Sequence, residues 1–275
     1  MTSFTSPEYV APNPASAVGA DTPCVTTQQR VYVVLPAYNE QDALAPLLDA
    51  LRQALEPARL PYTVIVVDDG SRDATAQVAG NASLEMPIVL IEHGVNQGLA
   101  AALRTGLGAA IERCGPDDVI VTMDADNTHP PRLIPEMVAK LQRDHDVVIA
   151  SRFQPGARVH GVPRSRELYS LGARWIFQVM FPIRNVRDYT CGYRAYRAGA
   201  LRRAIDAYGD QLITETGFAC MADVLLKLRR LELRMTEVPL ELHYDRRGSG
   251  SKMRVLRTIR QTLLLVVRRR LGWRR

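Results

Sequence analysis

The sequence predicts an α/β protein with a mostly parallel sheet and helices on both faces. Short runs rich in Val and Ile alternate with longer segments of helical spacing, and the runs are apolar throughout, as in strands that are buried on both faces. A polar cluster stands at the end of four of these runs: PAYNE, DDGS, DADNTHP and SR. Strands that alternate with helices in this way favour a parallel sheet.

The predicted elements follow one another from residue 31 to residue 153. The first strand is VYVVL, which stops in a loop at Pro36, and helical spacing follows over residues 41–55. The second strand runs from Tyr62 to Val67 and turns into a helix, for which we expect Ser71 or Asp73 to be the cap. The alternation then continues with a strand at 87–93, a helix at 98–114, a strand in 118–126, a helix at 133–144 and a strand at 146–153.

Length and composition favour a single large domain in a reducing compartment. The chain has 275 residues, of which 47% are apolar, and this is enough to bury one substantial core. The four cysteines form no CxxC pair, which indicates neither a zinc site nor a disulfide framework. They are Cys24, Cys114, Cys191 and Cys220. We expect a disordered tail at 1–29, one domain at 30–250 and a basic amphipathic helix at 251–275.

The C-terminal helix combines positive charge with an apolar face. From Arg246 onward there are eleven Lys or Arg residues and no Asp or Glu, in a chain whose net charge is +6. The apolar face of the helix, which ends in a Trp, holds Leu256, Ile259, Leu263 and Val267. We expect this helix to lie on an anionic membrane surface, and the alternative is a helix that packs on the sheet. The longest apolar run, LLLVV at 263–267, is far shorter than the roughly 18 to 20 residues of a membrane span, so we expect a peripheral protein.

The polar clusters at the strand ends predict one ligand site, because sheets of this kind bind ligands outside the carboxyl ends of their strands. Asp124 and Asp126 directly follow the run VIVTM. Two carboxylates two residues apart at a strand end can face one hard cation, and Mg²⁺ or Mn²⁺ binds through a few carboxylates plus diphosphate oxygens. Asp is also common in turns, so the prediction depends on the placement of this pair.

Two further loops at the same edge fit a nucleotide. Asp68 ends the second strand, where its carboxylate suits a base or a ribose, although a turn and helix cap would also explain it. The loop with Pro36, Tyr38 and Glu40 could simply end a strand, but a Tyr beside an acid is well suited to stack on a base and to bind a ribose hydroxyl.

The motifs LPAYNE, VVDDGSRDAT, HGVNQGLAAALRTG and MDADNTHPP, in this order, resemble glycosyltransferase family 2 and its nucleotide-diphospho-sugar transferase (GT-A) fold. The segments ASRF at 150–153, DYTCGYRAYR with Asp188 and Thr190, and EVPLELHYDRRGSGSK at 237–252 are similar to one branch of it. That branch makes dolichyl-phosphate or polyprenyl-phosphate mannose and includes bacterial glucose-transferring relatives.

The resemblance implies a role for each matching residue. Pro36, Tyr38, Glu40 and Asp68 would hold the nucleoside of the donor, and Asp124 and Asp126 the metal, with Asp124 also on the donor side. Arg152, Arg166 and Ser170 would bind the acceptor phosphate, and Arg246 and Lys252 would close over a phosphate or diphosphate. For each Arg a solvated surface charge is the alternative.

The sequence departs from this branch at two places. Thr128 stands where the branch often has a Gln as a further metal ligand, and a water could fill that place. Residues 220–223 read Cys, Met, Ala, Asp, where the branch has an aromatic residue, Gln, any residue and Glu. The shorter carboxylate of Asp223 would alter the acceptor or sugar preference, and Asp223 is the candidate base if the acceptor is a hydroxyl group.

The expected reaction moves a hexose, mannose or glucose, from a donor of the GDP-mannose or UDP-glucose type to a polyprenyl phosphate at the cytoplasmic face of the cell membrane. A lipid phosphate is already ionised near neutral pH, so it needs no base, and a single displacement would invert the anomeric carbon. Asp126 and Arg152 would then act on the charge of the reacting phosphates.

Three other functions agree less well with the sequence. The first is a family 2 transferase that acts on a polysaccharide or a soluble hydroxyl acceptor, which the Arg residues between 152 and 166 disfavour. The second is a nucleic-acid-binding protein, which would need basic charge but no acid pair at a strand end. The third is a nicotinamide enzyme, which would need a glycine-rich loop after the first strand, where this chain has PAYNE.

Overall fold

The structure is a computed structural model that describes residues 29–162, 164–217, 219–244 and 255–272, with the backbone alone at 164–167 and 255–257. The predicted tail lies outside the described residues except for residue 29, and so do Arg246 and Lys252. Arg166 has a described backbone, in a helix, but no described side chain.

The central sheet has seven strands within the described residues, in the order β3-β2-β1-β4-β7-β5-β8. The neighbouring strands are parallel except at β7, which runs antiparallel to both β4 and β5, so the expectation of a mostly parallel sheet is confirmed. The strands are β1 (Val31–Ala37), β2 (Tyr62–Asp68), β3 (Ile88–Glu92), β4 (Val119–Thr122), β5 (Val147–Ser151), β7 (Arg194–Arg197) and β8 (Met235–Pro239). A second, two-stranded parallel sheet contains β6 (Arg158–His160) and β9 (Glu241–His243).

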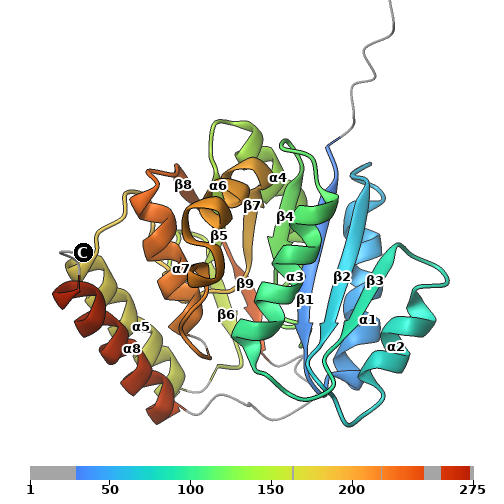
Figure 1. Cartoon of the computed structure of the whole chain (residues 1–275), viewed down its shortest axis with the longest axis horizontal. Helices are drawn as coiled ribbons and strands as arrows, with labels where there is room; N and C mark the ends of the chain where they lie inside the picture. Colours follow the sequence, from blue (N-terminus) through green and yellow to red (C-terminus); the bar gives the residue numbers. More distant parts are fainter. Residues whose placement is uncertain (1–28, 163, 218, 245–254, 273–275) are drawn as a thin grey trace, which may run out of the picture.

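Helices cover both faces of the central sheet, as expected. In Figure 1, α3 crosses in front of the sheet and α1 lies behind it. The helices are α1 (Gln41–Leu55), α2 (Thr75–Ala82), α3 (Leu99–Arg113), α4 (Ile134–Gln142), α5 (Arg164–Met180), α6 (Ala198–Tyr208), α7 (Ala219–Arg230) and α8 (Val255–Leu271), with 3-10 turns at Pro131–Leu133 and Gly209–Leu212. Neither of the two predicted caps of α2, Ser71 and Asp73, holds the N-cap position, which belongs to Ala74. The Asp73 carboxylate nevertheless accepts from the backbone N–H of Thr75 in the first turn, at 3.1 Å.

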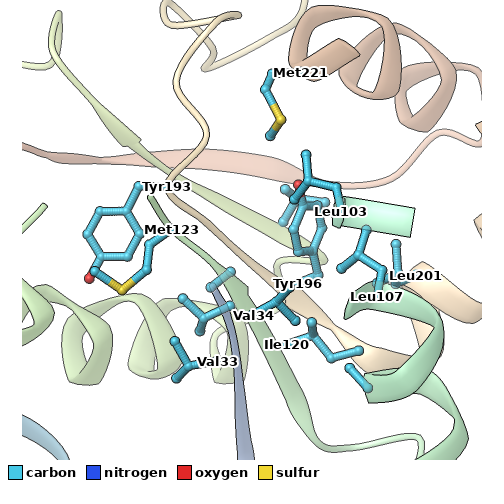
Figure 2. Packing of buried hydrophobic residues seen from close by; sticks show 14 of the residues in the cluster. Val33, Val34, Leu103, Leu107, Ile120, Met123, Tyr193, Tyr196, Leu201 and Met221 are labelled. Carbon is cyan, nitrogen blue, oxygen red and sulfur yellow. The ribbon is translucent and has the colours of Figure 1, made fainter. Parts of the chain in front are cut away.

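Helix α3 packs closely on β1 and β2. A Cβ atom on Gly106 of α3 would lie 2.4 Å from Cγ1 of Val34 and 3.1 Å from Cγ2 of Val67, so the helix approaches the sheet closely because this residue has no side chain. Figure 2 shows Leu103 and Leu107 of α3 in the same buried cluster as Val34. This contact fixes α3 against the strand ends that carry the predicted site.

The short antiparallel strand β7 was not predicted. Its sequence is RAYR, and Arg194, which opens it, is fully buried. The guanidinium donates to the carbonyl groups of Met221 and Tyr189, at 2.8 and 2.9 Å. Thr122, at the end of β4, donates through its hydroxyl to the carbonyl of Gly192 at 2.8 Å. These bonds hold the segment before β7 beside the end of β4.

Helices α5 and α8 form a layer at the edge of the molecule far from β3 (Figure 1). They pack against each other, and α8 also packs on α7. One face of α8 is buried, through Thr258, Thr262 and Leu265, whereas Leu263 and Val267 are about half exposed. The helix therefore packs on the domain and still presents apolar side chains to the outside. None of the helices within the described ranges has the length and apolar composition needed to cross a bilayer.

Candidate active site

One cavity of about 820 Å³ opens where the carboxyl ends of β1 and β4 meet the start of α3. Most of the predicted residues whose side chains are described line it together: Pro36, Tyr38, Glu40, Asp124, Asp126, Arg152 and Ser170. Asp68 and Asp223 do not line it. The four clusters that the sequence places at strand ends thus come together around one space, although two of the candidate acids point elsewhere.

The loop after β1 is fastened to the loop after β2. The backbone N–H of Asn39 donates to the Ser71 hydroxyl at 2.9 Å, and the N–H of Glu40 donates to the Thr75 hydroxyl at 2.8 Å. In return the Asn39 side-chain oxygen accepts from the N–H of Arg72 at 2.8 Å. Asn39 has a φ of 51°, a left-handed conformation that Asn tolerates better than most residues. These bonds hold Tyr38 and its neighbours at the cavity edge.

The two adjacent acids at the end of β2 have different surroundings. Asp68 is buried and accepts from the backbone N–H of Ser71 at 3.3 Å as well as from its hydroxyl, which is the turn that the sequence left as an alternative. This carboxylate is not part of the cavity wall, and its contact with the nucleoside stays a prediction. Asp69 lines the cavity and was not singled out by the sequence analysis.

Asp69 organises the loop that leads into α3. Its carboxylate accepts from the backbone N–H groups of Gln97 and Gly98, at 2.9 and 2.7 Å, and from Nδ1 of His93 at 2.8 Å. His93 Nε2 lies 3.0 Å from the hydroxyl of Thr105 in α3. The acid therefore braces the loop that leads into α3, and residues 96–98 of this loop line the cavity together with Leu99, the first residue of the helix.

The predicted metal pair closes β4 as expected. Both Asp124 and Asp126 line the cavity. Asp126 accepts from the hydroxyl and the N–H of Thr128, at 2.7 and 3.2 Å, and the N–H of Asp124 donates to Nδ1 of His129 at 3.3 Å. Thr128 thus orients one carboxylate of the pair. Among the described side chains no group of three or more His, Cys, Asp or Glu forms a complete metal cage, so a cation here would draw its further ligands from a bound diphosphate or water.

Arg152 is held at the cavity wall by a buried acid. Its Nε and Nη2 donate to the two carboxylate oxygens of Asp188, at 2.8 and 2.7 Å, and Nη2 also donates to the Thr190 hydroxyl at 2.7 Å. Nη1 donates to the hydroxyl of Ser170 at 3.2 Å. Burial alone would raise the pKa of Asp188, but the Arg152 charge and hydrogen bonds hold that pKa below its usual value. Arg152 stays charged, and its fork geometry is fixed before any ligand binds.

Asp223 faces away from the cavity. The carboxylate is fully buried, and its oxygens pair with Lys227 at 2.6 Å and with Arg269 of α8 at 2.5 Å. A base needs access to the proton it removes. The ion pairs argue against the role as a base that the sequence left open for Asp223.

The C-terminal helices contribute lining residues that the sequence analysis missed. Tyr169 of α5 and Thr258 and Gln261 of α8 all line the cavity. The available signal was a polar stripe at helical spacing, since Thr258, Gln261 and Thr262 interrupt the apolar and basic pattern of the helix. The amphipathic interpretation used only the Leu, Ile, Val and Arg positions.

The fold matches solved structures of sugar transferases. One is glucosyl-3-phosphoglycerate synthase from Mycobacterium tuberculosis, crystallised with Mn²⁺, UDP-glucose and phosphoglyceric acid. It superposes with a TM-score of 0.61 and 20% sequence identity over 89% of this chain and 80% of that one. At this identity the likeness concerns the fold, and it confirms the expected GT-A fold in a single domain.

Sequence comparison identifies the family. The family described as glycosyl transferase family 2 matches residues 32–206. An undecaprenyl-phosphate mannosyltransferase of Micrococcus luteus is 36% identical over 82% of this chain and 87% of its own length. A dolichol-phosphate mannosyltransferase of Pyrococcus furiosus is 32% identical over 80% of this chain, which spans 58% of that protein. The chain is a glycosyltransferase and belongs to family 2.

Proposed function

We propose that this glycosyltransferase moves a hexose, mannose or glucose, from a nucleotide-diphosphate sugar to a polyprenyl phosphate at the inner face of the cell membrane. The observation that carries the proposal is the shared cavity, in which the acid pair Asp124 and Asp126 and the guanidinium of Arg152 line one space. The two mannosyltransferase relatives are named for lipid phosphate acceptors, which supports this acceptor class.

The donor would occupy the end of the cavity between β1 and β4. The fastened loop after β1 offers Tyr38 for stacking on the base and Glu40 for a ribose hydroxyl, beside Pro36. The diphosphate would then lie toward the acid pair. The donor of the solved relative, UDP-glucose, belongs to the class proposed here.

Asp124 and Asp126 would hold Mg²⁺ or Mn²⁺. The fit rests on the acids themselves: both are on the cavity wall, and Thr128 already holds the Asp126 carboxylate. Hard cations of this kind take carboxylates together with phosphate oxygens. When bound, such an ion neutralises negative charge on the departing nucleoside diphosphate.

The acceptor phosphate would bind near Arg152 and Ser170. Asp188 and Thr190 occupy Nε and Nη2 of Arg152, so Nη1 with the Ser170 hydroxyl is the part of the cluster that remains for a ligand. An oxygen of the acceptor phosphate forms a bond to the anomeric carbon as the bond to the donor diphosphate breaks and its electron pair leaves with the nucleotide. An already ionised phosphate needs no base, and one displacement inverts the anomeric configuration.

The exposed apolar residues of α5 and α8 support contact with a membrane. Large apolar side chains that are at least 38% exposed gather on these two helices: Leu168, Leu171, Trp175, Val179 and Met180 on α5, and Leu263, Leu264, Val267 and Leu271 on α8. The basic residues Arg268 and Arg270 stand beside the second set and are exposed. An apolar face flanked by Arg suits the interface of an anionic bilayer.

A transfer assay with purified protein tests the function. Donors with guanine or uracil and with mannose or glucose are supplied with a polyprenyl phosphate and Mg²⁺ or Mn²⁺, and labelled sugar is measured in the organic phase. We expect lipid-dependent transfer that EDTA abolishes and that Asp126→Ala lowers by about 100-fold or more. Asp206→Ala, an exposed acid on α6, is the matched control and should keep full activity.

Two outcomes would contradict the proposal. Full activity in EDTA would remove the metal from the mechanism. Label in a water-soluble or polymeric product, with none in the lipid fraction, would favour a hydroxyl acceptor.

A further inference from the structure

We propose that Arg269 is a positioning residue for the acceptor end of the cavity: through its ion pair with Asp223 it fixes α8 so that Thr258 and Gln261 complete the wall there. This inference rests on the proposed function, because it assigns that end of the cavity to the lipid phosphate. It gives the C-terminal helix a part in the site that is separate from contact with a membrane.

The inner face of α8 reaches the cavity and the elements around it. Thr258 and Gln261 line the cavity, and the Gln261 side-chain amide donates to the Thr216 hydroxyl at 3.0 Å. Thr262 lies 2.9 Å from the Tyr169 hydroxyl, oxygen to oxygen. Tyr169 precedes Ser170, the residue that bonds to Arg152. One helix face therefore contacts both the loop before α7 and the helix that carries the proposed phosphate ligand.

The Gln261 side chain lies beside Gly217 in the loop before α7. Gly217 has a φ of +60°, and a Cβ atom there would lie 3.4 Å from the Gln261 side-chain oxygen. Thr216 and Gly217 both line the cavity. The loop before α7 and the helix therefore share one edge of the wall and are joined there by the Gln261–Thr216 hydrogen bond, so a displacement of α8 would change the shape of the cavity.

Asp223 joins the three segments that meet at this edge. One carboxylate oxygen accepts from Nε of Arg269 at 2.8 Å, and the other accepts from Lys227 of α7 at 2.6 Å and from the Thr214 hydroxyl at 3.2 Å. Lys227 also donates to the carbonyl of Leu212 at 3.1 Å. A fully buried carboxylate is costly without partners, and here the partners are Arg269, Lys227 and Thr214.

The ion pair between Arg269 and Asp223, called the clamp below, lies at a distance from the cavity wall that it positions. Arg269 lies eleven residues beyond Thr258, roughly 16 Å along a helix that rises about 1.5 Å per residue. Arg269 does not line the cavity, so it cannot contact a ligand there. When Arg269 is removed, Asp223 keeps Lys227 and Thr214, so α7 should remain folded. Helix α8 then loses its buried ion pair with Asp223 and keeps the exposed one between Arg268 and Glu215, at 3.3 Å.

The test separates acceptor effects from donor effects. Arg269→Gln, Arg269→Lys and Gln261→Ala are assayed with a short polyprenyl phosphate in detergent, so that membrane binding plays no part. We expect Arg269→Gln to raise the KM for the acceptor about tenfold, as for loss of one charged hydrogen-bonding partner, with the KM for the donor within about twofold of wild type. Arg269→Lys should restore most of the loss, and Gln261→Ala should raise the acceptor KM as well.

Amide hydrogen exchange tests, without any measurement of catalysis, whether the Arg269–Asp223 ion pair fixes α8. Hydrogen exchange should become faster in Arg269→Gln at residues 258–262 and 214–217 and stay unchanged in β1 and β2. The control is Arg203→Gln, an exposed arginine on α6, which should change neither readout.

The outcomes separate the inference from the function it rests on. An acceptor KM within about twofold of wild type in Arg269→Gln would overturn the inference, and so would an equal rise in the KM of donor and acceptor. If the wild type transfers no sugar to lipid phosphate, the proposed function fails. The exchange data then still decide whether the ion pair fixes α8 against the 214–217 loop, and unchanged exchange would refute the clamp.

Discussion

Replacement of Arg152 by Ala should cost stability as well as activity, because the variant leaves a buried carboxylate without its cation. Asp188 is fully buried and receives a bidentate ion pair from Arg152, at 2.8 and 2.7 Å. Breaking a buried pair by removing one partner costs about 3–5 kcal/mol. Asp188 keeps backbone N–H donors from residue 152, Thr190 and Cys191, at 3.1, 3.2 and 3.0 Å, so we expect a value near the lower limit, about 3 kcal/mol.

The loss of unfolding free energy in Arg152→Ala should be smaller at acid pH than at neutral pH. In the wild type the pKa of Asp188 is lowered, so its stabilising effect is present above the unfolded-state value of 3.8 and is lost as the pH falls through the lower folded value. In Arg152→Ala the carboxylate stays buried with its backbone N–H donors and the Thr190 hydroxyl but without the Arg152 cation. The pKa of Asp188 should therefore be higher than in the wild type, and protonation then removes the buried charge. The difference in unfolding free energy between wild type and variant should therefore be largest near pH 7 and shrink toward pH 4.

Urea denaturation at several pH values measures this difference, and Asp188→Asn with the double variant completes a thermodynamic cycle. A loss of about 3 kcal/mol corresponds to a fall in Tm of roughly 6–12 °C for a domain of this size. Arg152→Lys keeps the charge but not the fork, so it should recover part of the stability and little of the acceptor affinity. A cost below about 0.5 kcal/mol at pH 7, or a cost that grows toward pH 4, would refute the reasoning.

Three further predictions concern the core, a cavity thiol and the outer surface. Gly106→Ala should lower the unfolding free energy by about 1–3 kcal/mol, since a Cβ would lie 2.4 Å from Val34. Gly108→Ala, in open space on the same helix, should raise the unfolding free energy by up to about 1 kcal/mol, and thermal melts compare the two variants directly. Burial raises the pKa of the Cys191 thiol to about 12, so iodoacetamide at pH 8 should label this residue in urea and leave it unmodified in the folded protein, and rapid native labelling would contradict that. Trp175 and Leu264 are 60% and 41% exposed, and replacing either by Ser should weaken co-sedimentation with anionic vesicles without changing transfer to a short acceptor in detergent. The control is Leu84→Ser, which changes an exposed side chain outside α5 and α8 and should alter neither measurement.

The sequence predicted the first half of the fold more completely than the second. Up to residue 153 the strands are mostly apolar runs, and β1, β2, β4 and β5 are almost entirely buried, so local pattern and tertiary burial agree there. The edge strand β3 is an exception, because its apolar residues are only partly buried. The strand β7 does not have this property, because its four residues begin and end with Arg. Arg194 is buried with its guanidinium bonded to two backbone carbonyls, that of nearby Tyr189 and that of Met221 in α7. No local pattern in RAYR indicates those partners.

The sequence also predicted some residues of the site and not others. Asp124, Asp126 and Arg152 were placed correctly at the cavity because strand order alone brings strand ends together. The choice between Asp68 and Asp69 could not be made from the sequence, since it depends on which carboxylate turns toward Ser71 and which toward residues 97–98.

Asp223 illustrates why a substitution within a motif says little about chemistry until the neighbours of that residue are known. From the sequence it is a shortened family carboxylate, and a change in substrate preference was the natural interpretation. In the structure its partners are Lys227, one helical turn away, and Arg269, which lies 46 residues further along the chain. A carboxylate that already satisfies two cations inside the protein has little remaining potential to act on a sugar or a phosphate. Any influence of Asp223 on the acceptor should therefore pass through the position of α8, which is why the variants of Arg269, and not those of Asp223, separate the two explanations.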